Sequence, residues 1–246
     1  MNKIDLYKKI NHLIHKAGFD VRRFPEGGQR RLLKYLQTND TNDCFDIGAN
    51  TGQFALLLRS AGFKGNIFSF EPQTKAFENL ERFAAADPKW KAYNIGLGNV
   101  DEKSIINLSK NSVSSSILDI NKILTDTEPE TEYISREEIT ILRLDSFLKE
   151  MNFSKKIFLK IDAQGYESKI LEGLGDCFEA VYALQIELSC IPLYEGEKLF
   201  DEMKDFIESK GFFVSSLESG FADALTGRLL QAEAIFLRDV VKTRIY

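Results

Sequence analysis

Apolar and polar residues follow two different rhythms along this chain, and the change comes near residue 43. Before it, apolar residues fall at helical spacing and predict one helix that ends near Gly18 and a second over 30–36. After it, short apolar runs alternate with amphipathic stretches. The predicted strands are 44–47, 66–70, 91–95, 139–144, 157–162, 181–188, 212–217 and 234–237. The predicted helices between them include 54–59, 74–85, 168–174 and 197–210.

This alternation predicts the fold class. Strands that alternate with helices form a largely parallel sheet covered on both faces, which is an α/β fold. Right-handed crossovers then place the functional loops at the carboxyl ends of the strands. We expect residues 1–40 to form an N-terminal helical extension and residues 41–246 to form the main domain. The segment 121–138 does not follow the pattern: it is polar and acidic, and it is either a mobile loop near the site or a solvated excursion.

Composition and charge exclude several classes of protein. Of the 246 residues, 43% are apolar and 28% are charged, which excludes a disordered, collagen-like or coiled-coil chain. The net charge of −5 gives no overall attraction to nucleic acid, so we expect no nucleic-acid partner. The first residues lack the apolar core of a signal peptide, and no stretch predicts a transmembrane segment. Three cysteines without C-x-x-C spacing fit a reducing compartment, and we predict a cytoplasmic protein.

A glycine-rich turn after the first predicted strand carries the sharpest chemical signal. It has the sequence DIGANTG over 46–52 and opens a predicted helix. Glycines there let the backbone approach a ligand, and the start of the helix supplies N–H donors, although a simple tight turn with a helix cap has the same composition. The spacing differs from the Gly-x-Gly-x-x-Gly of dinucleotide binders. The carboxylate of Asp46 would repel a pyrophosphate but suits a cationic ligand, which favours S-adenosylmethionine over NAD.

Charged residues also stand at the ends of two other predicted strands. Glu71 follows the strand over 66–70, where a carboxylate can accept hydrogen bonds from both ribose hydroxyls of an adenosine. Taken alone, Glu71 is equally well explained as a surface acid. Lys160 and Asp162 end a buried strand, where Asp162 is placed to meet a reactive group. The alternative is that Lys160 and Asp162 only pair with neighbouring side chains.

Together these motifs resemble the FkbM family of S-adenosylmethionine-dependent methyltransferases. The resemblance lies in DIGANTGQF (46–54), FEP (70–72), NIGLGN (94–99), LKIDAQGYE (159–167) and QIELS (185–189), and GRLLQAEAIFLR (227–238) also resembles the closing strand region of one branch of the family. It implies a class I, Rossmann-like fold, with a seven-stranded, mostly parallel sheet, an antiparallel last strand and helices on both faces. It also implies that residues 41–246 are a methyltransferase domain that methylates a hydroxyl of a saccharide or secondary metabolite.

The resemblance further implies roles for individual residues. The residues that would hold the methionine end of S-adenosylmethionine are Asp46, Gly48, Asn50 and Gly52. Glu71 would bind the ribose, and residues from Asn94 to Gly96 would border the adenine. The serine run 112–116, with Ser115 in it, offers hydroxyl groups near the same pocket or is a polar turn.

The acceptor hydroxyl must lose its proton, and the sequence restricts which residue can take it. The chain has only two histidines, His12 and His15, and both lie in the first predicted helix. A carboxylate is therefore the expected base, with Asp162 the first candidate and Lys160 beside it as a second catalytic residue. A metal held by Asp162 and Glu187 could instead lower the pKa of the hydroxyl, and oxygen ligands suit Mg²⁺ or Ca²⁺.

Several alternatives stay open at this point. The chain could be a nucleotide-dependent (NAD) oxidoreductase on a similar sheet, or a non-catalytic homologue that binds the cofactor. Tyr194 could stack on a sugar ring or be an ordinary loop aromatic. The expected partner is a small-molecule or saccharide acceptor, and a homodimer is compatible with the sequence.

Overall fold

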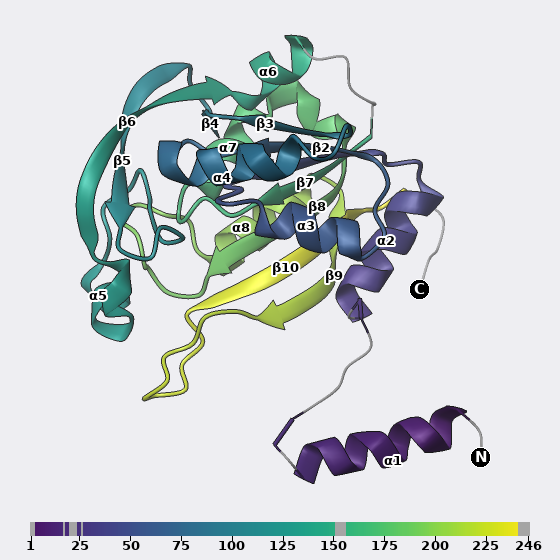
Figure 1. The fold of residues 1–246 in the computed structure, drawn as a ribbon. Coiled ribbons are helices and arrows are strands. Elements are labelled where there is room, and N and C mark those ends of the chain that lie inside the picture. The colour runs from purple at the N-terminus through teal and green to yellow at the C-terminus, as the bar shows by residue number, and fades with distance from the viewer. Residues whose placement is uncertain (1–2, 17, 20–23, 26, 151–155, 241–246) are drawn as a thin grey trace.

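Seven strands form the central sheet, in the order β3-β2-β1-β7-β8-β10-β9 (Figure 1). Their bounds are β1 Asp43–Ile47, β2 Asn66–Phe70, β3 Trp90–Tyr93, β7 Ile157–Ile161, β8 Val181–Ser189, β9 Phe212–Ser219 and β10 Gln231–Arg238. β10 runs antiparallel to both neighbours, and the other neighbouring pairs are parallel. The predicted seven-stranded sheet with an antiparallel last strand is confirmed. The arrangement comes from a computed structural model, which describes residues 3–16, 18–19, 24–25, 27–150 and 156–240.

Helices cover both faces of this sheet because alternate side chains of each strand point to opposite faces. One face packs against α2 (Gly27–Thr38), α3 (Gln53–Ser60) and α4 (Thr74–Ala84), and we call it the α3 face. The other packs against α6 (Leu144–Glu150), α7 (Glu167–Gly173) and α8 (Phe200–Ser209), and we call it the α7 face. A short 3₁₀ helix, η2 (Gly175–Ala180), leads into β8.

A second, three-stranded sheet lies beside the first, in the order β4-β6-β5. It consists of β4 (Gly96–Gly98), β5 (Glu102–Ser109) and β6 (Tyr133–Arg143). The prediction that 139–144 forms a strand of the central sheet is therefore wrong, since 139–143 end β6 of the second sheet and Leu144 begins α6.

The polar segment 121–138 also differs from both expectations. It contains α5 (Lys122–Thr127), the 3₁₀ helix η1 (Pro129–Thr131) and the first half of β6. Leu124 and Thr131 are buried, so these turns are anchored to the rest of the fold. The charged residues of β6 are tolerated because much of the strand faces solvent while its backbone pairs with β5.

The two N-terminal helices have different surroundings. α1 (Lys3–Lys16) lies apart from the sheet in Figure 1, and its His12 and His15 are exposed. α2 packs on β8, β9 and β10 through buried Leu32 and Leu36. Among the described helices, we find none with the length and apolar character needed to cross a membrane.

Candidate active site

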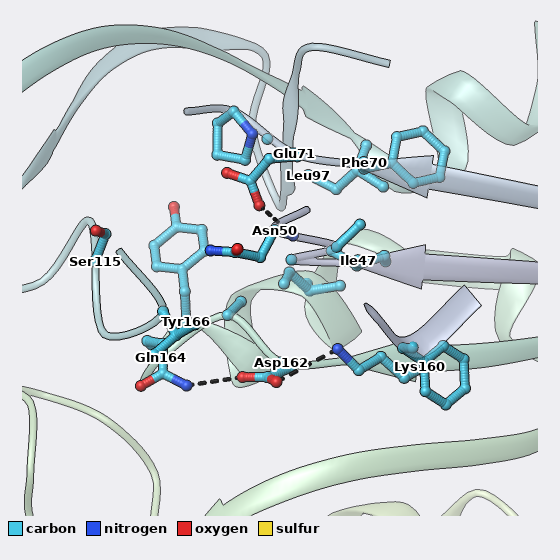
Figure 2. Close-up of a pocket in the computed structure, with 18 of the residues that line it drawn as sticks. Ile47, Asn50, Phe70, Glu71, Leu97, Ser115, Lys160, Asp162, Gln164 and Tyr166 are labelled. Atoms are coloured by element: carbon cyan, nitrogen blue, oxygen red, sulfur yellow. Dashed lines mark hydrogen bonds and ion pairs between the residues drawn. The ribbon is translucent and has the colours of Figure 1, made fainter. Parts of the chain in front are cut away.

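A cavity of about 400 Å³ opens at the carboxyl ends of β1, β2 and β7, as expected for a sheet of this topology, and reaches Gln185 in the middle of β8 (Figure 2). Its apolar walls come from both sheets. The apolar lining includes Ile47, Phe54, Leu57, Phe70, Ile95, Leu97, Ile106 and Ile117. The polar lining includes Gln29, Asn50, Glu71, Ser115, Lys160, Asp162, Gln164, Gln185 and Glu233. A mostly apolar cavity with a few convergent polar groups is typical of a small-molecule site.

The turn after β1 is packed directly against the turn after β7. Gly48 has φ +75°, and a side chain there would collide with the backbone oxygen of Asp162. The Gly48 and Ala49 N–H groups each donate to the carbonyl of Phe70 at 3.0 Å. Only glycine fits at position 48, because the backbone there is left-handed and there is no space for a Cβ atom. Two strand ends that carry predicted site residues are thereby held together.

Glu71 is a buried carboxylate at the cavity wall. Its two oxygens accept hydrogen bonds from the backbone N–H groups of Asn50 at 2.7 Å and Gln73 at 2.9 Å. Burial raises the pKa of Glu71 to about 7, and these two donors limit the rise. Asn94 does not line the cavity; its side chain donates to the carbonyls of Glu71 and Pro72 at 2.9 and 3.0 Å. Asn94 therefore fixes the backbone that carries Glu71.

The other residues predicted near a cofactor fall into two groups. Gly48, Asn50, Gly96 and Ser115 line the cavity. Gly52 does not: a side chain there would meet Trp90 and Leu80, so its role in the fold is close packing of α3 against its neighbours. Asp46 does not line the cavity either and is 0% exposed.

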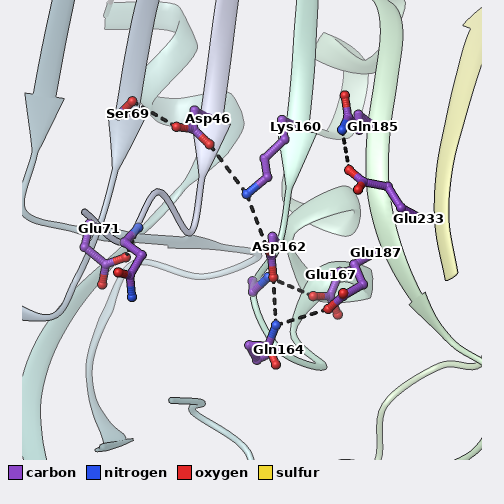
Figure 3. Close-up of polar contacts among 12 residues, drawn as sticks. Asp46, Ser69, Glu71, Lys160, Asp162, Gln164, Glu167, Gln185, Glu187 and Glu233 are labelled. Carbon is purple, nitrogen blue, oxygen red and sulfur yellow. Dashed lines mark hydrogen bonds and ion pairs between the residues drawn. The ribbon is translucent and has the colours of Figure 1, made fainter. Parts of the chain in front are cut away.

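Asp46 belongs to a polar row that crosses the α3 face of the sheet (Figure 3). The strand register aligns one residue from each of four adjacent strands. In strand order these residues are Ser69, Asp46, Lys160 and Gln185. Ser69 donates to Asp46 Oδ2 at 3.1 Å, and Asp46 Oδ1 lies 3.6 Å from Lys160 Nζ. Gln185 donates in turn to Glu233 of β10.

Lys160 is a buried cation held by acids. Its Nζ lies 3.4 Å from Asp162 Oδ2 and also pairs with Asp46. Burial alone lowers the pKa of Lys160, but Asp162, Asp46 and Glu233 more than reverse this and raise it above its ordinary value. Burial raises the pKa of Asp46, and Lys160 opposes that rise. Lys160 is therefore an ammonium group near neutral pH, which can orient Asp162 but cannot accept a proton.

Gln164 holds the free side of Asp162. Its backbone is left-handed, with φ +52°, and its amide Nε2 donates to Asp162 Oδ1 at 2.7 Å and to Glu187 Oε2 at 3.2 Å. The amide oxygen accepts from the Tyr194 hydroxyl at 2.6 Å. Tyr194 is 0% exposed, so the idea that it stacks on a sugar ring is wrong. Its ring is enclosed by the fold and its hydroxyl orients Gln164.

Glu187 lies behind this amide and does not line the cavity. Burial, together with Asp162 and Glu167, raises the pKa of Glu187 to about 8. Burial also raises the pKa of Glu167 to about 7. In the described part of the chain, no group of three or more His, Cys, Asp or Glu side chains is arranged to hold a metal ion. The magnesium site at Asp162 and Glu187 is not supported.

Sequence reasoning missed three cavity residues at the end near α2: Gln29, Gln185 and Glu233. For two of them, the sequence contains a pattern that could have identified them. Gln185 and Glu233 interrupt the apolar runs ALQIEL (183–188) and AEAIF (232–236), where an isolated polar residue needs a buried partner. Gln29 lies among other polar residues of α2, and nothing in the sequence distinguishes it.

Comparison with known proteins identifies the family. Residues 46–214 match the sequence profile described as "Methyltransferase FkbM domain". The chain belongs to the FkbM methyltransferase family. Membership makes this FkbM protein a methyltransferase and removes the oxidoreductase alternative.

Individual relatives have low sequence identity to this FkbM chain. "Methyltransferase 1" of Beauveria bassiana (strain ARSEF 2860) is 26% identical over 191 residues, which cover 72% of this chain and 74% of the fungal protein. A crystallised FkbM methyltransferase from Methylobacillus flagellatus KT is 14% identical, with a TM-score of 0.49; the match covers 79% of this chain but only 44% of that protein. TrmK of M. capricolum, crystallised with S-adenosylhomocysteine, is 8% identical, with a TM-score of 0.49 and coverage of 88% and 70%.

Proposed function

We propose that this FkbM protein transfers a methyl group from S-adenosylmethionine to a hydroxyl of a saccharide or secondary metabolite. One observation carries the proposal: a single cavity joins the Glu71 carboxylate and the Gly48 turn to the Lys160–Asp162 pair. A cofactor bound along the first part would present its reactive end to the second. The acidic lining also fits a ligand whose reactive centre is cationic, since three described lining residues are acids and Lys160 is already neutralised.

The proposed cofactor contacts are made by the residues that line the cavity and are supported by the residues behind its wall. Glu71 accepts hydrogen bonds from the ribose hydroxyls, and Gly48 and Asn50 approach the methionine end. The adenine lies between apolar side chains that include Ile95 and Leu97, near Gly96 and Ser115. Asp46 and Gly52 act from behind the cavity wall, the first through Lys160 and the second through the packing of α3.

The proposed mechanism is an in-line displacement. Bound S-adenosylmethionine supplies an electrophilic methyl group on its sulfonium. The chain aligns the acceptor oxygen with that methyl group and excludes water through the apolar walls. Asp162 takes the proton of the acceptor hydroxyl as the oxygen–carbon bond forms and the sulfur–methyl bond breaks, with the sulfur leaving as a neutral thioether. Lys160 and Gln164 each hold one oxygen of Asp162, so both are positioning residues in this scheme.

Residues 1–40 are proposed as an extension and 41–246 as the methyltransferase domain, with α2 of the extension adding Gln29 to the cavity. A cytoplasmic location and a homodimer stay predictions of the sequence, and the magnesium ion at Asp162 and Glu187 is a prediction that the described residues do not support. Mg²⁺ is included in the first experiment for that reason.

The first experiment compares thermal unfolding of the full chain with S-adenosylhomocysteine, NAD and NADP, each with and without Mg²⁺. S-adenosylhomocysteine at about 100 times its Kd should stabilise the protein by about 2.7 kcal/mol, and the nicotinamide nucleotides should not. Glu71→Gln should weaken S-adenosylhomocysteine binding, whereas Glu78→Gln, an exposed acid on α4, should leave it unchanged. Stabilisation by NAD instead would contradict the proposed cofactor.

The second experiment separates binding from turnover. Asp162→Asn should keep the Kd for S-adenosylhomocysteine within about twofold and lower methyl transfer to sugar acceptors by about 100-fold or more. Full turnover in this variant would exclude Asp162 as the base.

A further inference from the structure

One end of the cavity has no role in the proposed mechanism. It lies under α2 and contains the side chains of Gln29, Gln185 and Glu233 beside Lys160. Figure 3 shows Gln185 and Glu233 next to each other at the end of the polar row. The family match covers 46–214, so Gln29 and Glu233 lie outside the part that the chain shares with the family profile.

Two acceptor oxygens at this end have no hydrogen-bond partner among the residues that the structure describes. Glu233 receives the Gln185 amide on Oε1, and its Oε2 makes no hydrogen bond to any residue that the structure describes. Gln29 Oε1 is buried and has no partner within the same described residues. The one cation nearby, Lys160, is committed to Asp46 and Asp162. A ligand that fills this end must therefore bring donors of its own.

The charge of the cavity lining favours a cationic ligand over an anionic one. The acids among the described lining residues are Glu71, Asp162 and Glu233, and the single cation is Lys160. A carboxylate or phosphate placed beside Glu233 would be repelled by its carboxylate. A protonated amine has up to three N–H donors and a positive charge. Phe54 and Leu57 line the same cavity and give the carbon skeleton of such a ligand an apolar wall.

We propose that Gln29, Gln185 and Glu233 form the acceptor subsite and that it selects an acceptor bearing a protonated amino group, such as an amino sugar, over a neutral or anionic one. This inference rests on the proposed function. Glu233 binds the ammonium group, and a hydroxyl of the same molecule then faces Asp162. The amine itself is not methylated while it is protonated, because its lone pair is occupied.

The test measures binding of three matched probes to the protein saturated with S-adenosylhomocysteine, below pH 7, where the amine is protonated. The probes are methyl glucosaminide, methyl glucoside and methyl glucuronide, which carry the same ring with an amine, no charge and a carboxylate. We expect Kd to rise in that order, with about tenfold or more between the first and the last, which corresponds to about 1.4 kcal/mol. Glu233→Gln should reduce this ratio to about threefold or less without changing the Kd for S-adenosylhomocysteine. Glu78→Gln removes the same charge from α4 and should keep the full ratio.

The outcomes separate the two proposals. If S-adenosylhomocysteine fails to bind, the proposed function fails. If it binds but the glucuronide binds as well as the glucosaminide, or none of the three probes binds in the millimolar range, the acceptor inference alone is overturned. A preference for the amine that survives in Glu233→Gln also overturns it.

Discussion

The two faces of the central sheet differ in a way that separates stability from chemistry. On the α7 face, adjacent strands place Phe45, Leu159 and Leu184 in one continuous apolar core. On the α3 face, the same three strands present Asp46, Lys160 and Gln185 in a row near their carboxyl ends. Neighbouring residues of one strand therefore have different tasks: one side chain packs in the apolar core, and the next belongs to the polar row.

The polar row carries a cost that the apolar face does not. A buried ion pair such as Asp46–Lys160 loses the hydration of both ions, and well-packed apolar residues in its place are often as stable or more stable. The row is also incomplete as a network, because Asp46 Oδ1 lacks a hydrogen-bond partner within the described residues. The polar row therefore serves the site rather than stability, because its Lys160 holds Asp162 at the cavity.

The largest combined effect, on stability and on turnover together, should come from breaking the row at its centre. Lys160→Met leaves Asp46 and Asp162 without their shared cation, and we expect a loss of about 3 kcal/mol in the free energy of unfolding. The double variant Asp46→Asn/Lys160→Met should recover most of this loss while methyl transfer stays abolished. Urea denaturation and a turnover assay on both proteins measure the two effects separately. If the double variant is as unstable as Lys160→Met, the pair is not the source of the cost.

A substitution on the apolar α7 face should lower stability without affecting cofactor binding. Leu184 is fully buried and adjoins Gln185 in β8, so Leu184→Ala creates a cavity in the α7-face core. We expect a loss of about 2–5 kcal/mol in unfolding free energy, with the Kd for S-adenosylhomocysteine within about twofold of the wild type. Urea denaturation and calorimetric titration check the two values. A large change in that Kd would show that the two faces are not independent.

A pH experiment tests the acids behind Gln164. The pKa of Glu187 rises from its ordinary 4.5 to about 8 in the folded protein. Between these values the native state holds a proton that the unfolded chain has lost, so stability falls as pH rises, by up to about 1.4 kcal/mol per pH unit. Glu187→Gln should flatten this fall between pH 7 and 8, above the pKa of about 7 for Glu71 and Glu167. Urea midpoints across this range give the slope, and parallel slopes in the variant and the wild type would contradict the assignment.

The smallest effect concerns the hydroxyl that orients Gln164. Tyr194→Phe keeps the buried ring and removes the hydrogen bonds that the hydroxyl donates to the Gln164 amide oxygen and to the Ser114 carbonyl. We expect a loss of about 1 kcal/mol in stability and a modest fall in kcat with KM unchanged, since Asp162 loses part of its support. A change in KM alone would place Tyr194 in binding instead.

The sequence predicted the central sheet well because its strands are buried on both faces and appear as short apolar runs. It did not predict the second sheet. β5 and the first half of β6 carry many exposed charged residues, so their alternation is weak and their pairing depends on each other rather than on the core. The two glycines of β4, Gly96 and Gly98, gave no strand signal either, because glycine has no side chain to form a pattern.

The site was predicted in part for a similar reason. Gly48, Glu71, Lys160 and Asp162 follow strand ends, and topology alone brings strand ends together. Which side of the wall a strand residue occupies depends on strand register, and that is why Asp46 lies behind the cavity, whereas Gly52 lies behind it because it packs against Trp90 and Leu80. Gln29 and Glu233 come from opposite ends of the chain, and only the folded structure places them in one cavity.

The polar row also supplies the protein with a built-in optical reporter. The chain has a single tryptophan, Trp90, and its indole N–H donates to Ser69 Oγ at 2.9 Å. Ser69 donates to Asp46, so the indole is the third member of a hydrogen-bonded series that begins at the charged centre. Because indole emission responds to the local electric field, protonation of Asp46 or loss of Lys160 changes the fluorescence of the unlabelled protein. Every variant proposed along this row can be followed by its own intrinsic spectrum.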